Sequence, residues 1–473
     1  MTAIYLIAAL VALTWGIVFI LRGSLTLGCL AFLVVGACFG HRFLSFDLGP
    51  IPLTLDRLVL VLLIAAYIVK RWLGHTARKP VTRTDLPLLI FVVLLILSGC
   101  YGGWGGVQGQ PFATVFRLIA GYLIPFTLYW IARQTPLNRS KCSLIHGTLA
   151  GLGVYLAVTG LLEITGQWWA VFPRYIADPE VGTHFGRARG PMVQSVSFGL
   201  HLAVCLLAAW VWRWRFGRLG TLAIVALVPL MLAGIFFSYT RSVWMGTGLG
   251  VLIVLGVTLR GQWRPLVLGG MISAALLLVT TRMDNLISFE REYEATYTGQ
   301  SVSLRGSFAY ISWKMFQDRP LLGVGFGQFP TAKLDYLSDR STALNLEATR
   351  GRVHHSGFLS TLTETGLIGL ALFLTILIGW ARTSWLLCRD ATLPNWVRAQ
   401  GVLLLGVLGI YVCQAAFHEM SYTPIDNALV FFLAGITVGL KTATEELGSA
   451  PSTFALPEKS TAPLLADLGN AVS

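Results

Sequence analysis

The sequence predicts an all-α, polytopic integral membrane protein with about 12–13 transmembrane helices and one large loop outside the membrane. Hydrophobic residues make up 55% of the chain and charged residues only 12%, whereas a typical globular protein is about 25% charged. The apolar runs are about 18–22 residues long, enough to cross a bilayer at about 1.5 Å per residue. A soluble chain could not cover its surface with so few charges, but a chain surrounded by lipid has no need to.

The apolar runs give the expected spans directly. The run at 3–21 lacks the basic start and small-residue cleavage site of a signal peptide, so a retained helix is expected. The Gly-rich run at 24–40 also suits a re-entrant segment, which leaves the parity of 12 or 13 spans, and the side of the N-terminus, open. The expected spans lie near 3–21, 24–40, 54–71, 86–100, 112–132, 143–164, 191–212, 219–238, 241–259, 263–281, 355–380, 396–417 and 424–440.

The net charge is +13, and most Lys and Arg residues gather in short loops. The position of these residues orients a membrane protein and places those loops on the cytoplasmic side. No basic-aromatic module accompanies them, so nucleic-acid binding is not expected. All seven cysteines lie in or beside apolar runs, which suggests neither disulfides nor a cysteine metal site. Residues 1–444 are expected to form one transmembrane domain, and 445–473 a disordered cytoplasmic tail. The segments expected to face outward are 101–111, 165–190, 238–241, 282–354 and 418–423.

The outward loop 282–354 is the one sizeable extramembrane segment. Apolar residues recur at helical spacing from Leu304 to Met315, which predicts an interfacial helix near 303–317 that ends before Pro320. A glycine cluster follows at 323–327. Its spacing fits neither nucleotide-binding motif, so a sharp turn that allows close backbone approach is expected.

Three arginines stand out because they fall on the outward side, against the positive-inside bias. They are Arg189, Arg241 and Arg305. Snorkelling toward headgroups explains scattered cations at helix ends. A set at one membrane level instead suits an anionic ligand such as a phosphate, which a guanidinium binds in bidentate fashion.

The loop ends with two histidines, His354 and His355. Neighbours in a helix point about 100° apart and rarely ligate one ion together, so no metal or other cofactor is expected. A packed interfacial histidine is one interpretation, and a general base is the other, because neutral imidazole accepts a proton near pH 7. Gly366 and Gly369 lie about three turns downstream on the face of His355, where small residues would let another helix approach closely.

These residues together resemble the O-antigen ligase and polymerase superfamily. His355-Ser356, followed nine residues later by Gly366-Leu367-Ile368-Gly369, is similar to the family's histidine signature. The loop pattern from Arg305 to Phe329 and the stretch Ser238–Trp244 also resemble that family. Arg189-Gly190-Pro191 resembles the family's arginine segment but lacks its Asn-Pro pair.

The resemblance implies a multispan bacterial inner-membrane glycosyltransferase. Its donor would be a glycan linked to undecaprenyl pyrophosphate, and its acceptor lipid A-core or a growing glycan. His355 would act as the base in an inverting, metal-independent transfer, while Arg305, Arg241 and Arg189 would bind the pyrophosphate.

Three functions stay open on the sequence: an O-antigen ligase, a polymerase of O-antigen or exopolysaccharide, and a solute transporter. The ligase is preferred on the compact loop and the His-Ser form of the motif. A transporter should carry ionisable residues within its spans, for which Glu163, His201 and Glu364 are the candidates. No internal repeat supports it.

Overall fold

The computed structural model describes residues 14–40, 43–46, 52–76, 78–104, 112–259, 261–273, 277 and 298–449. Within these ranges it shows a bundle of helices and one β-ribbon of two strands with two residues each, so the prediction of an all-α membrane protein is confirmed. Eight of the described helices are long and apolar enough to span a membrane. They cover 113–134, 139–164, 195–215, 218–237, 241–258, 357–389, 395–417 and 424–446.

The other expected spans do not correspond to one of these eight long apolar helices. The helix α2 has 14 residues and would measure about 21 Å, too short to cross about 30 Å of hydrocarbon. The helix α3 carries charged residues near both ends, so its apolar centre is short. The expected spans 3–21 and 263–281 fall partly outside the described residues, as does the tail expected at 445–473, although α16 continues to Ser449.

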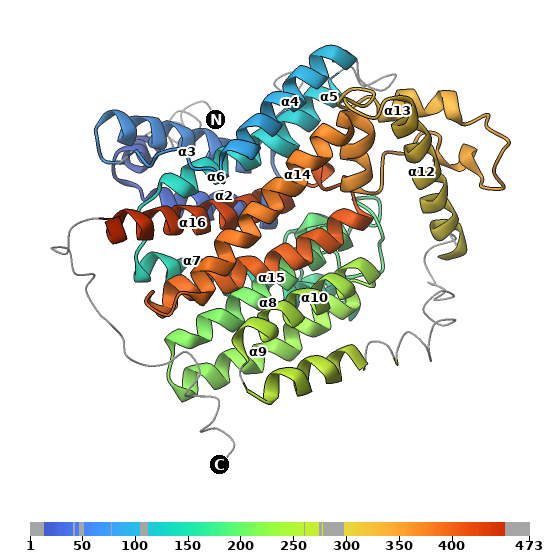
Figure 1. The fold of residues 1–473 in the computed structure, drawn as a ribbon. Coiled ribbons are helices and arrows are strands. Elements are labelled where there is room, and N and C mark those ends of the chain that lie inside the picture. The colour runs from blue at the N-terminus through green and yellow to red at the C-terminus, as the bar shows by residue number, and fades with distance from the viewer. Residues whose placement is uncertain are drawn as a thin grey trace, which may run out of the picture.

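The helices, drawn in Figure 1, follow in this order: α2 (Leu25–Cys38), α3 (Leu55–Trp72), α4 (Leu86–Gly102), α5 (Ala113–Leu118), the π-helical turn η1 (Ile119–Leu123), α6 (Ile124–Gln134), α7 (Arg139–Ile164), α8 (Ser195–Trp212), α9 (Arg218–Phe237), α10 (Arg241–Thr258), α12 (Thr298–Asp318), α13 (Phe329–Ala332), α14 (Gly357–Arg389), α15 (Asn395–Phe417) and α16 (Pro424–Ser449). Short 3₁₀ turns are η2 (Trp168–Ala170), η3 (Arg174–Ala177), η4 (Gly190–Met192), η5 (Arg213–Arg215), η6 (Lys333–Tyr336), η7 (Leu346–Thr349) and η8 (Met420–Tyr422). The antiparallel strands β1 (Ser45–Phe46) and β2 (Leu53–Thr54) pair Ser45 with Thr54 and Phe46 with Leu53.

The centre of the bundle is α8, which is 89% buried along its most apolar window. It packs against α7, α9, α10 and α15. The helix α15 also lies along α14 and α10, and α16 lies along α6. Helix α8 is apolar on all sides, as expected for a helix surrounded by other helices.

The segment 298–354 forms a small hydrophobic core of its own, which the sequence did not predict. Phe308, Ile311 and Met315 of α12 meet Phe329, Leu337 and Leu346 from the turns that follow. Figure 1 shows α12 and α13 gathered at one end of the bundle. The helix α12 ends at Asp318, two residues before Pro320. Its position at the membrane interface stays a prediction.

The helix α14 is broken at Gly366, where φ is 67° and ψ is −165°. The chain between Pro320 and Gly325 fills the gap. The backbone N–H of Leu367 donates to the Pro320 carbonyl at 2.8 Å, and the N–H groups of Val324 and Gly325 donate to the Thr363 and Glu364 carbonyls at 2.9 and 3.0 Å. Backbone groups freed by the break are thereby satisfied, as they must be inside a membrane.

Glycine is required at two points of this junction. A Cβ on Gly366 would stand 2.2 Å from the Leu321 backbone, and one on Gly323 would stand 2.5 Å from the Glu364 backbone. Both residues have positive φ. The glycine cluster therefore does allow close backbone approach, but the segment that approaches Gly366 is a loop rather than the helix that the sequence suggested.

We expect Gly366→Ala to lower the thermal unfolding midpoint of the detergent-purified protein. The left-handed backbone alone costs about 1–2 kcal/mol for a residue with a Cβ, and the overlap with Leu321 adds to it. Gly248→Ala in α10 is the matched control, because a Cβ there meets nothing within 4 Å. Equal midpoints for the two variants would contradict the role given to the break.

Candidate active site

The two histidines at the end of the long loop have different surroundings. His354 is buried and its Nε2 lies 2.8 Å from the Ser312 hydroxyl, while its Nδ1 accepts the Ser356 N–H at 3.1 Å. Because Nδ1 accepts, Nε2 carries the proton and donates to Ser312. Both ring nitrogens of His354 are thus occupied, so this histidine holds the loop end against α12.

His355 is half-buried and directed differently. Its ring meets the Phe308 ring edge to face at 5.1 Å between centroids. Within the described part of the chain, its imidazole has no hydrogen-bond partner. Both ring nitrogens are therefore available to a ligand. Ser356, the next residue, caps α14 by accepting the Leu359 N–H at 3.4 Å, which fixes the point at which the backbone leaves His355.

Lys333 holds the segment that precedes these histidines in the chain. Its buried ammonium donates to the Thr349 carbonyl at 2.6 Å and also to the Arg352 carbonyl. The same ammonium lies 5.6 Å from the centre of the Phe329 ring. Burial, with the charges of Arg350 and Arg352, lowers the pKa of Lys333 to about 8. One internal cation thus ties η7 to the small core beneath the site.

A third histidine, His418, joins the site from a distant part of the chain. It follows α15, and its carbonyl accepts the Gly357 N–H at 3.1 Å, two residues after His355. Its Nε2 lies 2.9 Å from the Ser242 hydroxyl in the first turn of α10. His418 therefore connects the starts of α10 and α14. The only signal for it in the sequence was the pair His418-Glu419 in an expected outward turn.

Arg305 on α12 lies close to Arg241 and to the two histidines His355 and His418. Its guanidinium stands 5.5 Å from the centre of the Phe417 ring, and it has no acidic or carbonyl partner among the described residues. Burial and the charge of Arg241 lower the pKa of Arg305. Two cations thus lie close enough to repel each other at one end of the bundle.

The same charges keep the histidines neutral. Burial, followed by Arg305, Arg352 and Lys333, lowers the pKa of His355 to about 4. Burial, Arg305, His355 and His184 lower the pKa of His418 to about 3. Arg305 is therefore the common neighbour of Arg241, His355 and His418. The structure thus brings the predicted Arg241, Arg305 and His355 together and adds His418, which was not predicted.

Arg189 lies in a different setting. Its side chain is 1% exposed, and its guanidinium donates to the carbonyls of Val181, Ile176 and Asp178 at 2.7, 2.9 and 3.2 Å. Its Nε also stands 3.7 Å from a Glu163 carboxylate oxygen. This geometry favours a role in holding the loop before α8, and contact of Arg189 with a pyrophosphate stays a prediction.

The two glycines of the histidine signature both serve close contacts. Gly366 forms the break described above. At Gly369 a Cβ would overlap the Thr365 hydroxyl on the preceding turn and would come within 3.5 Å of Leu94 on α4. The helices α14 and α4 are in contact, so Gly369 lies where a helix neighbour was expected.

A buried ion network lies beside the part of α14 that precedes the break at Gly366. Arg117 of α5 contacts both Glu364 carboxylate oxygens, at 2.7 and 2.8 Å, and stands 3.5 Å from Glu419. It also donates to the Ser421 and Ser360 hydroxyls at 2.6 and 2.9 Å. Arg117 was not predicted as a site residue, because the partners of a single arginine in an apolar span become visible only in the folded chain.

The three residues that a transporter would use all have fixed partners. Glu163 accepts the backbone N–H groups of Arg189 and Gly190 at 2.9 and 2.7 Å. His201 Nδ1 lies 3.0 Å from an Asp426 oxygen, and Glu364 is held by Arg117.

Within the described ranges, no group of three or more His, Cys, Asp or Glu side chains has the geometry to hold a metal ion.

Comparison with known families bears on this arrangement directly. Residues 226–374 match the model of a family described as O-antigen ligase. This segment of the chain is similar to the O-antigen ligase family. The resemblance predicted from the motifs is thus confirmed, and the matched segment contains Arg241, Arg305 and His355. No curated protein matches the chain.

The matched segment does not contain all the residues of the candidate site. His418, which binds Ser242 and Gly357, lies after the matched segment, and Arg117, which binds Glu364, lies before it. The family implies glycan transfer of the O-antigen ligase or polymerase kind in a multi-pass bacterial membrane protein that works on lipid-linked glycans.

We expect Arg117→Leu to destabilise the protein strongly, because it leaves Glu364 and Glu419 buried without their counter-charge. The cost of such an uncompensated charge is on the order of 3–5 kcal/mol. Thermal unfolding in detergent measures it. The double variant Arg117→Met/Glu364→Met should recover part of the loss, because apolar residues of similar volume often replace a buried pair and only Glu419 then lacks its counter-charge.

The matched control is Arg350→Leu. Arg350 pairs with Glu347 at 2.8 Å with side chains 59% and 48% exposed, and such surface pairs contribute only about 0–1 kcal/mol. If Arg117→Leu proved no less stable than Arg350→Leu, the buried network would not be supporting the fold.

Proposed function

We propose that this protein transfers a glycan from an undecaprenyl-pyrophosphate-linked donor to an acceptor hydroxyl at the periplasmic face of the bacterial inner membrane. The observation that carries the proposal is the grouping of Arg305 with Arg241, His355 and His418 at one end of the bundle. The similarity to the O-antigen ligase family supports it. We prefer a ligase that transfers a finished glycan to lipid A-core.

The two arginines suit the pyrophosphate of the donor. Arg241 and Arg305 repel each other in the free protein, so an anion placed between them would relieve that repulsion. A guanidinium can bind phosphate oxygens in bidentate geometry. Arg305 has no internal acceptor within the described residues, which leaves its donors to a ligand. We therefore assign the pyrophosphate to this pair, with Arg189 supporting the neighbouring loop.

The transfer needs one base and one stabilised leaving group. His355 accepts the proton of the acceptor hydroxyl, and the oxygen attacks the anomeric carbon of the donor sugar as the bond to the pyrophosphate oxygen breaks. The electron pair of that bond leaves with undecaprenyl pyrophosphate. Attack from the face opposite the leaving group inverts the anomeric carbon. Arg305 and Arg241 stabilise the charge that develops on the leaving phosphate, so the step uses only groups of the chain.

The low pKa of His355 gives donor binding a second effect. With a pKa of about 4, the imidazole is neutral at pH 7 but a weak base. A pyrophosphate anion beside Arg305 cancels part of the positive field that depresses this pKa. Donor binding thus raises the basicity of His355, and the base becomes effective when the donor is in place.

His418 acts in this proposal as a positioning residue. It is neutral, and its bonds to Ser242 and Gly357 hold the starts of α10 and α14 at a fixed separation. Arg241 is the first residue of α10 and His355 lies two residues before α14. The distance between cation and base therefore depends on His418.

We expect His355→Ala and Arg305→Ala, expressed in a strain deleted for this protein, to abolish or sharply reduce glycan transfer. Loss of one charge-stabilising donor costs about 2–4 kcal/mol of barrier, or roughly 10²–10³-fold in rate. Transfer from a purified lipid-linked donor measures the rate. His75→Ala, in an exposed turn after α3, is the control. Full activity of correctly inserted His355→Ala protein would exclude His355 as the base.

The same deletion strain separates ligase from polymerase, the alternative that shares this chemistry. Polymer that accumulates on the undecaprenyl carrier without transfer would support the ligase. Single repeat units without long chains would identify a polymerase instead. Solute uptake that depends on Glu163 or His201, with glycan transfer unaffected, would support a transporter.

The pH dependence follows from the requirement for neutral imidazole, because activity falls as the pH drops through the pKa of the base. In the free enzyme that pKa is about 4, so kcat/KM should hold to low pH. In the donor complex the pKa is raised, so kcat should fall at higher pH than kcat/KM does. Both parameters would be measured between about pH 4 and 8. Coinciding acid limbs would contradict donor-induced basicity.

A further inference from the structure

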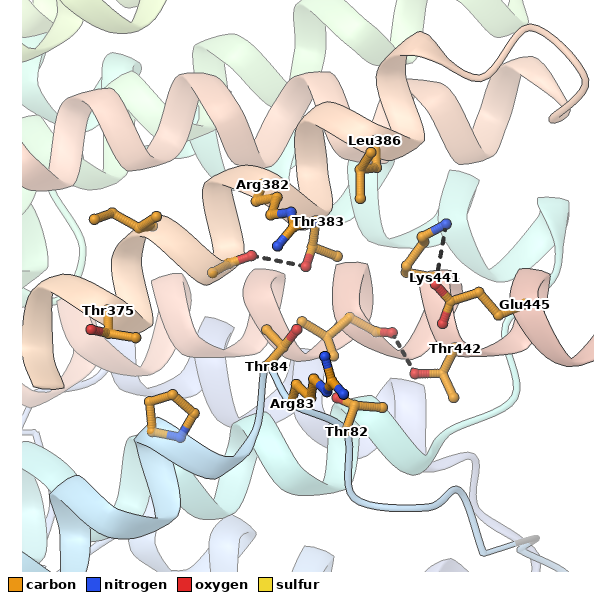
Figure 2. A pocket seen from close by; sticks show the side chains of 14 residues that line it. Thr82, Arg83, Thr84, Thr375, Arg382, Thr383, Leu386, Lys441, Thr442 and Glu445 are labelled. Carbon is orange, nitrogen blue, oxygen red and sulfur yellow. Dashed lines mark hydrogen bonds and ion pairs between the residues drawn. The ribbon is translucent and has the colours of Figure 1, made fainter.

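A cavity of about 390 Å³ lies far from the histidines, at the other end of α14. The loop 82–84 before α4, the second half of α14 and the end of α16 surround it (Figure 2). His355 stands before the first residue of α14, whereas Arg382 lies near its last turns. The cavity therefore lies on the side that the basic loops assign to the cytoplasm.

Two arginines in this cavity lack an internal partner. Arg83 comes from the loop before α4 and Arg382 from α14, and Figure 2 shows them facing the same space from opposite sides. Within the described residues, neither guanidinium has a hydrogen bond or an ion pair; Glu445, the one acidic side chain among the residues that line the cavity, pairs with Lys441 instead. Lys441, the third cation, pairs with Glu445 at 3.3 Å. The cavity is thus positively charged and offers guanidinium donors to an anion.

Of the five threonines that line the cavity, Thr82, Thr375, Thr383 and Thr442 already donate their hydroxyl protons within the protein. Thr383 and Thr442 donate their hydroxyl protons to the carbonyls of Gly379 and Val438 at 2.9 and 3.0 Å. Thr82 donates to Asp85 at 2.7 Å. Since Asp85 is itself paired with the buried Arg133 at 2.7 Å, the loop that carries Arg83 is held in place. Arg83 therefore projects from a fixed support.

Apolar side chains continue the cavity toward the lipid. Ile378 and Leu386 both line it and are 65% and 44% exposed. Ile378 lies one turn, about 6 Å, deeper in the membrane than Arg382 on the same helix. Pro87 and Val438 add further apolar wall. A ligand that fits must combine an anionic head with a hydrocarbon chain.

We propose that this cavity binds an anionic phospholipid of the cytoplasmic leaflet, whose phosphate Arg83 and Arg382 hold from two sides. The first acyl carbons would lie against Ile378 and Leu386. Basic pockets between membrane helices on the cytoplasmic side suit anionic headgroups, and two facing guanidinium groups match phosphate geometry. The lipid would connect α4, α14 and α16 at the end opposite the candidate active site.

The test is native mass spectrometry of the full-length protein, released from nanodiscs that contain equal amounts of phosphatidylglycerol and phosphatidylcholine. The wild type should retain phosphatidylglycerol selectively. Arg83→Gln/Arg382→Gln should retain it on the order of 30-fold more weakly, because each arginine beside an anionic lipid contributes roughly fivefold. Arg215→Gln/Arg389→Gln is the control, since it removes two exposed arginines of the same side that do not line the cavity.

Gly379→Leu provides a second variant that keeps every charge. Gly379 lines the cavity, and a Cβ there meets only Thr84 at an ordinary 3.5 Å, so the leucine side chain would extend into the space. The Gly379→Leu variant should therefore also retain less phosphatidylglycerol than the wild type. Equal retention in the Arg83/Arg382 variant and its control would overturn the proposal, as would equal retention of phosphatidylcholine by the wild type.

Thermal unfolding with added ligands distinguishes a lipid site from a site for a soluble anion. Phosphatidylglycerol should raise the unfolding midpoint of the wild type and leave that of the Arg83/Arg382 variant unchanged. Inorganic phosphate and glycerol 3-phosphate should produce no comparable shift, because they lack the chain that Ile378 and Leu386 would cover. If inorganic phosphate stabilised the wild type as much as the lipid does, the site would be one for a soluble anion and the lipid would be excluded.

Discussion

Peptide groups at the break in α14 would lose their hydrogen bonds inside the membrane if the chain from Pro320 to Gly325 did not supply them. In lipid, each such group left alone costs several kcal/mol. The extramembrane segment is consequently anchored in the bundle by backbone bonds that do not depend on side-chain chemistry. His355 lies before the first half of α14, and Glu364 lies just before the break. Both ends of the candidate site are therefore placed by one backbone junction.

The arginines buried inside the bundle have polar partners within the protein, whereas Arg305 at the candidate site does not. Arg117, Arg133 and Arg189 are buried, and each contacts carboxylates or carbonyls. Arg305 has an aromatic neighbour and a second cation instead. An arginine that is expensive to bury and has no partner in its own chain is suited to an anionic ligand. This contrast separates Arg305 from the three arginines that have partners within the protein, a difference that sequence position alone does not reveal.

Sequence reasoning succeeded where a local rule decides the outcome. Apolar runs gave the helices, and Pro320 gave the end of α12. Arg241, Arg305 and His355 were predicted from motifs, and the structure places them around one another. His418 and Arg117 were missed because their partners, Ser242 and Glu364, are 176 and 247 residues away in the chain. The setting of Arg189 was missed for a similar reason, since its carbonyl partners become visible only when the loop before α8 folds around it.

The bonds of His418 also set the smallest piece of this protein that could be exchanged with a homologous chain. A segment cut at 226–374 would carry Arg241, Arg305 and His355 but would leave behind the partner of Ser242 and Gly357. It would also separate Glu364 from Arg117. A chimaera designed on the boundaries of the matched segment alone would therefore inherit these candidate site residues without their spacing. The exchangeable unit runs at least from α5 through η8, which is most of the bundle.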